Sequence, residues 1–468
     1  MPYPRARQVV AATSSGMLLT GMMCSWGFPA AALSQMQKPG SVVNFTMQQA
    51  SWFATVTLLM CIPMSPIGAK ASDVLGLRRI MLILTPVLCL STMMMSAASL
   101  PVVYEAKAAE TFLLVCRVVQ ATVTALLAPL ITVYIYETTD QHLRGIMTSL
   151  VEFWATLGFV LSYVAGCLFD WVTIAWLLPL ITLVPAFIGI LASPESPFWM
   201  VKRGRMEEAK DILALLRCTE EEQKTDLEDA QRKLKNSATC SESVREATKL
   251  SNIKAIVASC LALIMKELGG YVVLSIYVVY IFEQAGVGMD PKWSSVIVGM
   301  TRMLCNCIAS SLWHNFSHRL ILIVGNVLIA IGTFFVGIFF YVQEKGEDVS
   351  YLSWLPLVGL VVHMIGAAGA IGPGTWALSV EVLPGPVRSF GFGLANTSYA
   401  ITGFCISKLL LDLQTLMGLK GVFWIFTGGS LSYIALLLLY IPETLGRSPK
   451  DIEDYWENRK EPAEDDKV

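Results

Sequence analysis

The feature that most constrains this chain is a series of long apolar runs, each long enough to cross a lipid bilayer as a helix. Crossing the hydrocarbon core takes about 20 helical residues. A helix also satisfies its own backbone hydrogen bonds, which lipid cannot do. We therefore predict an all-α membrane protein with twelve transmembrane helices. The predicted spans are 8–32, 51–69, 79–100, 109–136, 145–168, 171–192, 253–282, 293–313, 319–342, 353–381, 387–411 and 421–441.

Composition supports this class and argues against others. Hydrophobic residues make up 54% of the 468 residues and charged residues only 15%, whereas soluble proteins carry roughly 25% charged residues. A net charge of −2 argues against a nucleic-acid partner. The eleven cysteines show no metal-ligand spacing, and no catalytic or phosphate-binding motif is found, so we expect no metal, no cofactor and no enzymatic activity.

The basic residues of the short loops predict the orientation in the membrane. Loops rich in Lys and Arg stay in the cytoplasm. With both termini inside, the inner segments hold eight basic residues, including Arg5 and Arg7, and the outer loops hold five. No cleavage site follows the first run, so we interpret it as a span and not a signal peptide. Asn44 begins a sequon on the outer side and is a candidate N-glycan site, although an unused sequon fits equally well.

The two halves of the chain share a repeated pattern of charged residues. Glu137 is followed by Arg144, and 244 residues after Glu137 stands Glu381, which is followed by Arg388 at the same spacing. Such six-plus-six duplication is typical of transporters with a solute site between the halves. The predicted parts are an N-terminal six-helix bundle (1–192), a cytoplasmic linker with short helices (193–252), a C-terminal six-helix bundle (253–441) and a cytoplasmic tail (442–468).

The loop between the second and third spans has a defined pattern of glycines and charges. It reads IGAKASDVLGLRR over residues 67–79. A glycine turn can bring two helix ends together, and Asp73 can pair there with arginines. The loop resembles the signature of the major facilitator superfamily. The residues that fit this signature are Gly68, Asp73, Gly76, Arg78 and Arg79.

Other segments resemble the sugar-porter family of that superfamily. They are PESPFWMVKRGRMEEA (194–209), PETLGRSPKDIE (442–453), YIYETTDQHLRG (134–145) and GPGTWALSVEVLPGPVR (372–388). The first run and Ser51-Trp52 are most similar to insect trehalose transporters. The resemblance implies twelve helices and a cytoplasmic charge network that closes the inner gate. The network residues are Glu137, Arg144, Glu195, Glu381, Arg388, Glu443 and Arg447, joined by Asp73, Arg78 and Arg79. The alternative is that they are solvated helix-end charges.

The chain departs from the family at the gate. The arginine that the family places after P-E-S-P is Phe198 here. In the second half the loop signature has decayed to WHNFSHRL (313–320), which keeps Arg319. These departures predict a weaker or rearranged gate.

The family lines its central cavity with neutral amides, and here charges replace several of them. By alignment with the family, Lys266 and Glu267 take the place of two glutamines in span seven, Glu152 takes that of a glutamine in span five and Arg302 that of an asparagine in span eight. The resemblance also places Trp376 and Tyr399 at this cavity. Ionisable residues inside the membrane are functional by default. The alternative is that the four charges pair and staple the helices together.

Three functions remain open from the sequence. The resemblance favours a facilitative transporter of a hexose-like or trehalose-like sugar, a multi-pass protein of the plasma membrane. The four charges favour a transporter of a zwitterionic or charged solute. A non-transporting nutrient sensor is disfavoured by the 27 residues that follow Ile441. Span one lacks the aspartate typical of proton-coupled sugar porters, so we expect uniport, and we interpret His363 as a hydrogen-bonded core residue.

Overall fold

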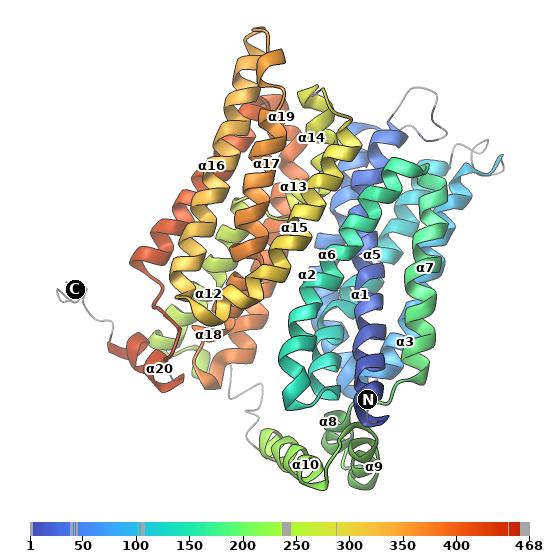
Figure 1. Ribbon diagram of the computed structural model, residues 1–468, viewed down its shortest axis with the longest axis vertical. Helices are drawn as coiled ribbons and strands as arrows, with labels where there is room; N and C mark the ends of the chain where they lie inside the picture. Colours follow the sequence, from blue (N-terminus) through green and yellow to red (C-terminus); the bar gives the residue numbers. More distant parts are fainter. Residues whose placement is uncertain are drawn as a thin grey trace. The chain divides into compact units, whose positions relative to one another are not determined.

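A computed structural model describes residues 3–37, 41, 43, 45–101, 103, 108–235, 245–286, 288–447 and 449–458. Helices and the turns between them form this part of the chain (Figure 1). Asn44 lies outside the described residues. The helices up to the linker are α1 (Tyr3–Met36), α2 (Met47–Leu75), α3 (Leu77–Met94), η1 (Met95–Ser99), α5 (Ala109–Thr138), α6 (Gln141–Leu168), α7 (Trp171–Ala192), α8 (Pro197–Lys202), α9 (Met206–Leu216) and α10 (Glu220–Lys235).

The second part of the chain contains shorter and more often interrupted helices. They are α12 (Leu250–Leu268), α13 (Val273–Ile276), α14 (Val278–Ala285), α15 (Pro291–Asn315), α16 (His318–Glu344), η2 (Ser350–Leu352), α17 (Leu355–Gly366), η3 (Ala367–Ile371), α18 (Gly372–Glu381), η4 (Gly385–Val387), α19 (Arg388–Leu439) and α20 (Pro449–Asn458).

The helices confirm the predicted spans. Ten stretches of the described chain are long and apolar enough to cross a membrane. One of them, α19, is two helices, because Gly418 within it has φ 72° and ψ 169°, a conformation that glycine adopts without strain. The predicted span 293–313 is not among the ten, but it forms the 25-residue helix α15. Each of the twelve predicted spans therefore coincides with helix.

Two of the spans are broken in the middle. Span seven stops at Gly269-Gly270, where Gly270 has φ 84°, and resumes as α13 and α14. Span ten consists of α17, the π-helical turn η3 and α18. Pro373 follows the π-helical turn, and it lacks the N–H that a regular helix needs there. The two breaks meet, since a Cβ atom on Gly372 would lie 2.7 Å from the Tyr271 hydroxyl. Broken helices of this kind are tolerated where backbone lines a protein-enclosed site.

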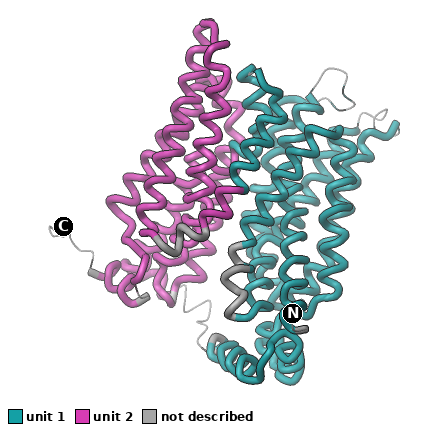
Figure 2. The backbone as a smooth tube through the Cα atoms, viewed as in Figure 1, with its two compact units in different colours: residues 1–237, 274–303 teal, residues 238–273, 304–468 magenta. Residues whose placement is uncertain are grey.

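The backbone divides into two compact units (Figure 2). Unit 1 comprises residues 1–237 and 274–303, and unit 2 comprises residues 238–273 and 304–468. The units differ from the predicted halves in one segment, 274–303, which contains α13, α14 and the first part of α15. This segment packs with unit 1, where α14 contacts α1 and the Tyr163 hydroxyl donates a hydrogen bond to the Ser275 carbonyl over 2.7 Å.

Unit 1 is a bundle in which α1 packs on α6 and α7, while α2 and α3 pack on α5. Leu18, Met81 and Leu127 are fully buried in its apolar core. Close helix contact requires small residues in membrane bundles. Gly68 is the clearest case, because a Cβ there would lie 2.2 Å from the Leu126 carbonyl oxygen.

Unit 2 is built on three long contacts, of α12 with α19 and of α16 with α17 and α19. Gly332 of α16 lies against α17 so closely that a Cβ would approach the Gly359 carbonyl oxygen to 2.4 Å. Beside the Gly418 break, Lys420 and Glu344 form an ion pair of 2.8 Å.

The stretch after α7 forms the short helices α8, α9 and α10. The amphipathic stretch MEEAKDILALLR corresponds to α9. The three helices share a small apolar core of their own. It contains Trp199, Met200, Val201, Ala209 and Ala230.

Candidate solute site and charged helix ends

Lys266 lies in an aromatic cage inside unit 2. Its side chain belongs to the last turn of α12, and the residue is only 1% exposed. The ammonium nitrogen is 4.3 Å from the ring centre of Tyr271, 4.7 Å from that of Trp376 and 5.4 Å from that of Tyr399. It also donates a hydrogen bond of 3.3 Å to the Gly372 carbonyl. The electron-rich ring faces and the carbonyl dipole stabilise the charge away from water.

The breaks in spans seven and ten build this cage. The Gly269-Gly270 turn ends α12 and returns Tyr271 toward the lysine, while α18 begins at Gly372 and carries Trp376 one turn later. The rings of Trp376 and Tyr399 meet edge to face with centres 5.0 Å apart. Three of the predicted cavity residues, Lys266, Trp376 and Tyr399, are thus brought together.

Glu267 is equally buried, at 1% exposed. Adjacent helical residues point about 100° apart, so this carboxylate faces a different side of α12 from its neighbour. His363 of α17 supports the helix end, since its Nε2 atom lies 3.1 Å from the Gly269 carbonyl oxygen. With 0% exposure and this hydrogen bond, His363 matches its interpretation as a core residue.

The other two predicted cavity charges belong to unit 1. Arg302 is 8% exposed, donates a hydrogen bond of 2.9 Å to the Ser275 hydroxyl and lies 4.7 Å from the ring centre of Phe159. Glu152 of α6 is half-buried. Each unit therefore carries two of the four charges. A single cavity that joins all four stays a prediction.

Two carboxylates organise the end of unit 1 at which α8 lies. Glu195 is buried and accepts hydrogen bonds from the backbone N–H groups of Arg78, over 2.9 Å, and of Ser196, over 3.1 Å. The Ser196 hydroxyl donates to Glu137. The Arg78 guanidinium donates to the carbonyl groups of Ile190 and Leu191 and so closes the end of α7. Three predicted gate residues therefore form one connected group.

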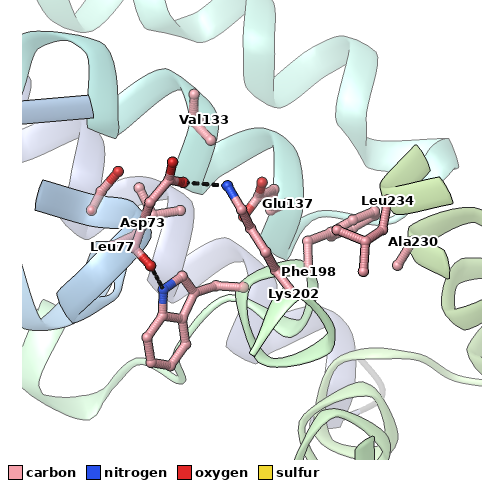
Figure 3. Close-up of a pocket in the computed structure, with 10 residues that line it drawn as sticks. Asp73, Leu77, Val133, Glu137, Phe198, Lys202, Ala230 and Leu234 are labelled. Atoms are coloured by element: carbon pink, nitrogen blue, oxygen red, sulfur yellow. Dashed lines mark hydrogen bonds and ion pairs between the residues drawn. The ribbon is translucent and has the colours of Figure 1, made fainter. Parts of the chain in front are cut away.

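Asp73 has a different partner from the one expected. It forms an ion pair of 2.6 Å with Lys202 of α8, where the sequence suggested arginines (Figure 3). Both side chains are about half exposed, so the pair is a weak, screened one. The pair borders a cavity of about 270 Å³ that Glu137 and Phe198 also line. Arg79 is exposed.

The end of unit 2 repeats this arrangement with one substitution. Glu443 accepts hydrogen bonds from the Ser317 hydroxyl and from the backbone N–H groups of His318 and Arg319. The Thr444 hydroxyl donates to Glu381 over 2.6 Å, as Ser196 does to Glu137 in unit 1. The new element is the imidazole of His318, whose Nδ1 atom lies 3.0 Å from the Glu381 carboxylate.

The environment of Glu443 changes its pKa. Burial opposes ionisation, but hydrogen bonds from Ser317 and from the N–H groups of Leu445, Arg319 and Thr444 outweigh it, so the pKa of Glu443 lies below its usual value. The carboxylate is therefore held ionised at neutral pH.

The remaining gate predictions concern arginines. Arg388 is half-buried and donates to the Leu383 carbonyl over 3.3 Å, and Arg447 is exposed. The side chain of Arg144 lies outside the part that the structure describes. The charge network that the resemblance implies would pair Glu137 with Arg388 or its neighbours and Glu381 with Arg144, and these pairs stay predictions.

Comparison with known proteins places the chain. The family model described as "Sugar (and other) transporter" matches residues 12–456. The chain belongs to this family. It is 29% identical over 455 residues to the facilitated trehalose transporter Tret1 of Drosophila pseudoobscura pseudoobscura, covering 95% of this chain and 51% of that protein. It is 27% identical over 458 residues to Tret1 of Culex quinquefasciatus, and the match covers 95% of this chain and 85% of that protein. The chain spans about half the length of most of the curated relatives it matches.

Solved structures show the same fold. The partially occluded inward-open xylose transporter XylE from E. coli superposes with a TM-score of 0.78 at 18% identity, over 95% of this chain and 100% of that one. The inward-open form of the same transporter superposes with a TM-score of 0.76 at 18% identity, over 96% of this chain and 99% of that one. The fold is therefore that of a major facilitator superfamily transporter, and the protein is a multi-pass membrane protein.

Sequence reasoning missed Arg117, which lies in α5 and is 1% exposed. Its guanidinium donates to the Phe53 carbonyl over 3.1 Å, to the Ser25 carbonyl over 2.6 Å and to the Gln120 side chain. The Ser25 carbonyl needs this donor, because its helical partner four residues later is Pro29, which has no N–H. The signal in the sequence was an arginine inside a span, together with a proline inside α1.

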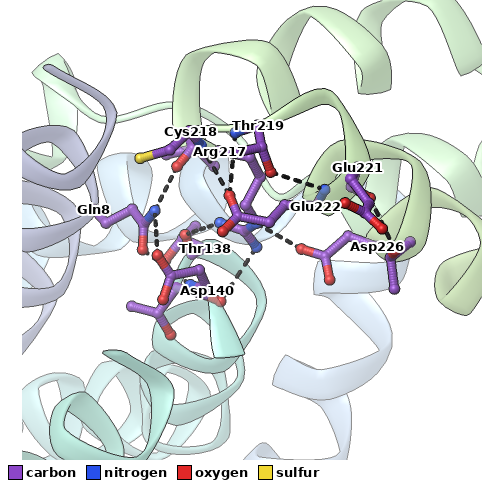
Figure 4. Close-up of polar contacts among 12 residues, drawn as sticks. Gln8, Thr138, Asp140, Arg217, Cys218, Thr219, Glu221, Glu222 and Asp226 are labelled. Atoms are coloured by element: carbon purple, nitrogen blue, oxygen red, sulfur yellow. Dashed lines mark hydrogen bonds and ion pairs between the residues drawn. The ribbon is translucent and has the colours of Figure 1, made fainter. Parts of the chain in front are cut away.

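It also missed the network that holds the linker helices to α1 and α5 within unit 1 (Figure 4). Arg217 pairs with Asp226 over 2.5 Å and donates to the carbonyls of Thr138 and Thr139 at the end of α5. Gln8 of α1 hydrogen-bonds to Asp140 and to the Leu216 carbonyl. These residues are far apart in the sequence, and no motif links them.

Proposed function

We propose that the protein carries a small polar solute across the membrane by alternating access, as a facilitative transporter of a hexose-like or trehalose-like sugar. The observation that carries this proposal is the aromatic group of Tyr271, Trp376 and Tyr399 at the breaks of spans seven and ten, in a member of the sugar transporter family. Solute sites of this size combine aromatic walls with a few placed polar groups. The names of the trehalose and xylose transporters support the same solute class.

A second candidate is a transporter of a charged or zwitterionic solute. It is favoured by the burial of Lys266 and Glu267, each 1% exposed at the break in span seven. Ionisable groups inside a membrane protein are costly and commonly serve the transported solute. The two proposals differ in the solute that the protein recognises and share the transport mechanism.

Uptake into vesicles tests both proposals. The full chain would be reconstituted into proteoliposomes and supplied with labelled trehalose, glucose, xylose or neutral and charged amino acids. Saturable sugar uptake that a protonophore does not change would support facilitative sugar transport. Saturable uptake of amino acids alone would favour the second candidate, and uptake of none of them would count against both.

The charged helix ends support the proposed gate. We propose that Glu381 stabilises the state closed to the cytoplasm, so Glu381→Gln should shift the population toward the inward-open state. The shift should be modest, since a partly solvated pair contributes about 1 kcal/mol. Alkylation of a single cysteine placed in the inner cavity measures it. Equal alkylation rates in the variant and the parent would contradict the role.

Two further proposals concern the cell. We propose that the protein resides in the plasma membrane, with both termini in the cytoplasm and Asn44 on the outer side. Surface biotinylation tests the first point. A mobility shift on deglycosylation that is absent in Asn44→Gln tests the sequon.

A further inference from the structure

The cage around Lys266 has the chemistry of a receptor for organic ammonium ions. Three ring faces surround one ammonium group at centroid distances of 4.3, 4.7 and 5.4 Å, and a backbone carbonyl accepts its hydrogen bond. Proteins that recognise free ammonium ligands use cages of this composition, because the ring quadrupoles attract the cation while the rings exclude water. Here the cation is supplied by the chain itself.

The walls of the cage are held by contacts other than the lysine. Trp376 meets Tyr399 edge to face at 5.0 Å and also meets Phe392 at 6.0 Å. The Tyr271 ring packs against the backbone at Gly372, where a Cβ would lie 2.7 Å from its hydroxyl. The rings should therefore keep their places when the lysine side chain is shortened.

We propose that this cage is a binding site for an organic ammonium ion that Lys266 occupies in cis. Removal of the lysine side chain beyond Cβ should leave a vacancy with the shape of n-propylammonium, which is the fragment removed. Other cation–ring contacts in the described part of unit 2 differ in kind. Lys345 and Lys420 lie 4.6 and 5.5 Å from the single ring of Tyr341, and Lys345 is exposed, whereas Lys266 lies over three rings.

The proposal has a consequence for the solute, and this consequence rests on the proposed transport function. With Lys266 in place, its ammonium group occupies the cage, so a second ammonium group cannot enter. The wild-type protein should then not bind a cationic solute such as choline in this cage. Lys266 is in this sense a specificity determinant.

Ligand binding to the purified full chain tests the cage without any transport assay. Lys266→Ala would be titrated with n-propylammonium chloride at constant ionic strength while tryptophan fluorescence and the melting temperature are recorded. We expect a saturable fluorescence change and a rise in melting temperature, because a ligand that binds only the folded state stabilises it. The neutral 1-propanol should bind at least tenfold more weakly, and the wild type should show neither effect.

Three variants serve as controls. Lys266→Met fills the same volume without charge and should not bind n-propylammonium. Lys345→Ala removes a lysine that lies over an exposed ring and should not bind it either. Lys266→Ala combined with Trp376→Leu removes one wall and should weaken binding at least tenfold. Binding by the Lys345 variant equal to that of Lys266→Ala would overturn the proposal.

The test remains decisive if Lys266→Ala folds poorly. In that case n-propylammonium in the purification buffers should restore the yield of folded protein, and 1-propanol should not. No restoration, or no binding by a folded variant, would refute the cage as an ammonium site. Absence of sugar uptake by the wild type would instead refute the proposed function, so the two failures are distinguishable.

Discussion

Arg217 should be the residue whose loss most weakens the attachment of the linker helices to α5 within unit 1. It is 2% exposed, and its three nitrogen atoms are engaged by the Asp226 carboxylate and the carbonyls of Thr138 and Thr139 over 2.5, 3.1 and 3.2 Å. These contacts join α10 to the end of α5. Arg217→Met keeps an apolar stem of similar length but removes every donor.

The expected loss of stability depends on the charged group that each substitution leaves buried without its partner. Asp226 is 6% exposed, so Arg217→Met leaves a buried carboxylate without its cation, which costs about 3–5 kcal/mol. Asp226→Asn should cost a similar amount, about 3–5 kcal/mol, because it leaves the buried Arg217 cation without its carboxylate. Replacing both residues, as Met and Leu, should recover most of the loss because no buried charge remains.

Hydrogen exchange is the suitable assay, because the loss is local to the linker. In Arg217→Met the amides of α10 should exchange faster by a factor that corresponds to the lost free energy, while those of α1 and α5 change little. Arg205→Met is the matched control, since Arg205 forms an exposed pair with Glu208 that should contribute less than about 1 kcal/mol. A cost below about 1 kcal/mol for Arg217→Met, or a double variant no more stable than the single one, would refute the reasoning.

Three other predictions concern the remaining sites. Because hydrogen bonds lower the pKa of Glu443, the stability that its carboxylate contributes should be complete at pH 7 and should disappear as the pH falls through the lowered pKa. The free energies of unfolding of the wild type and of Glu443→Gln should therefore converge in acid, and a difference between them that does not change with pH would contradict this. Gly68→Leu should push α2 away from α5, which lowers the stability by about 1–3 kcal/mol or more and therefore lowers the melting temperature. An unchanged melting temperature would argue against the close approach of Gly68 to Leu126. Lys266→Gln with Glu267→Gln restores the family's glutamines and should raise hexose uptake; unaltered uptake would count against an altered solute site.

The predictable part of the fold depends on length and apolarity. Twelve runs of about 20 apolar residues correspond to helices because lipid leaves the backbone no other partner. The breaks were harder to predict. Gly269-Gly270 is visible as a turn signal, and Pro373 marks an interruption of span ten, but these residues do not specify that Ala367–Ile371 forms a π-helical turn.

The site was predictable as a set of residues but not as a geometry. The family resemblance identified Lys266, Trp376 and Tyr399 as neighbours of one cavity, and the structure brings them together. It could not reveal Tyr271, since that contact depends on the backbone turn at Gly270. His318 was missed for the opposite reason. It stands where the decayed loop signature suggested a loss, yet it contacts Glu381 directly.

The cage explains how a lysine can lie inside an apolar span. A buried cation usually requires an acidic partner, because the desolvation penalty exceeds what neutral contacts return. Around Lys266, three ring faces and the Gly372 carbonyl offset part of that penalty. The same contacts should hold a separate ammonium ion once the lysine side chain is removed, and this is what the ammonium experiment measures.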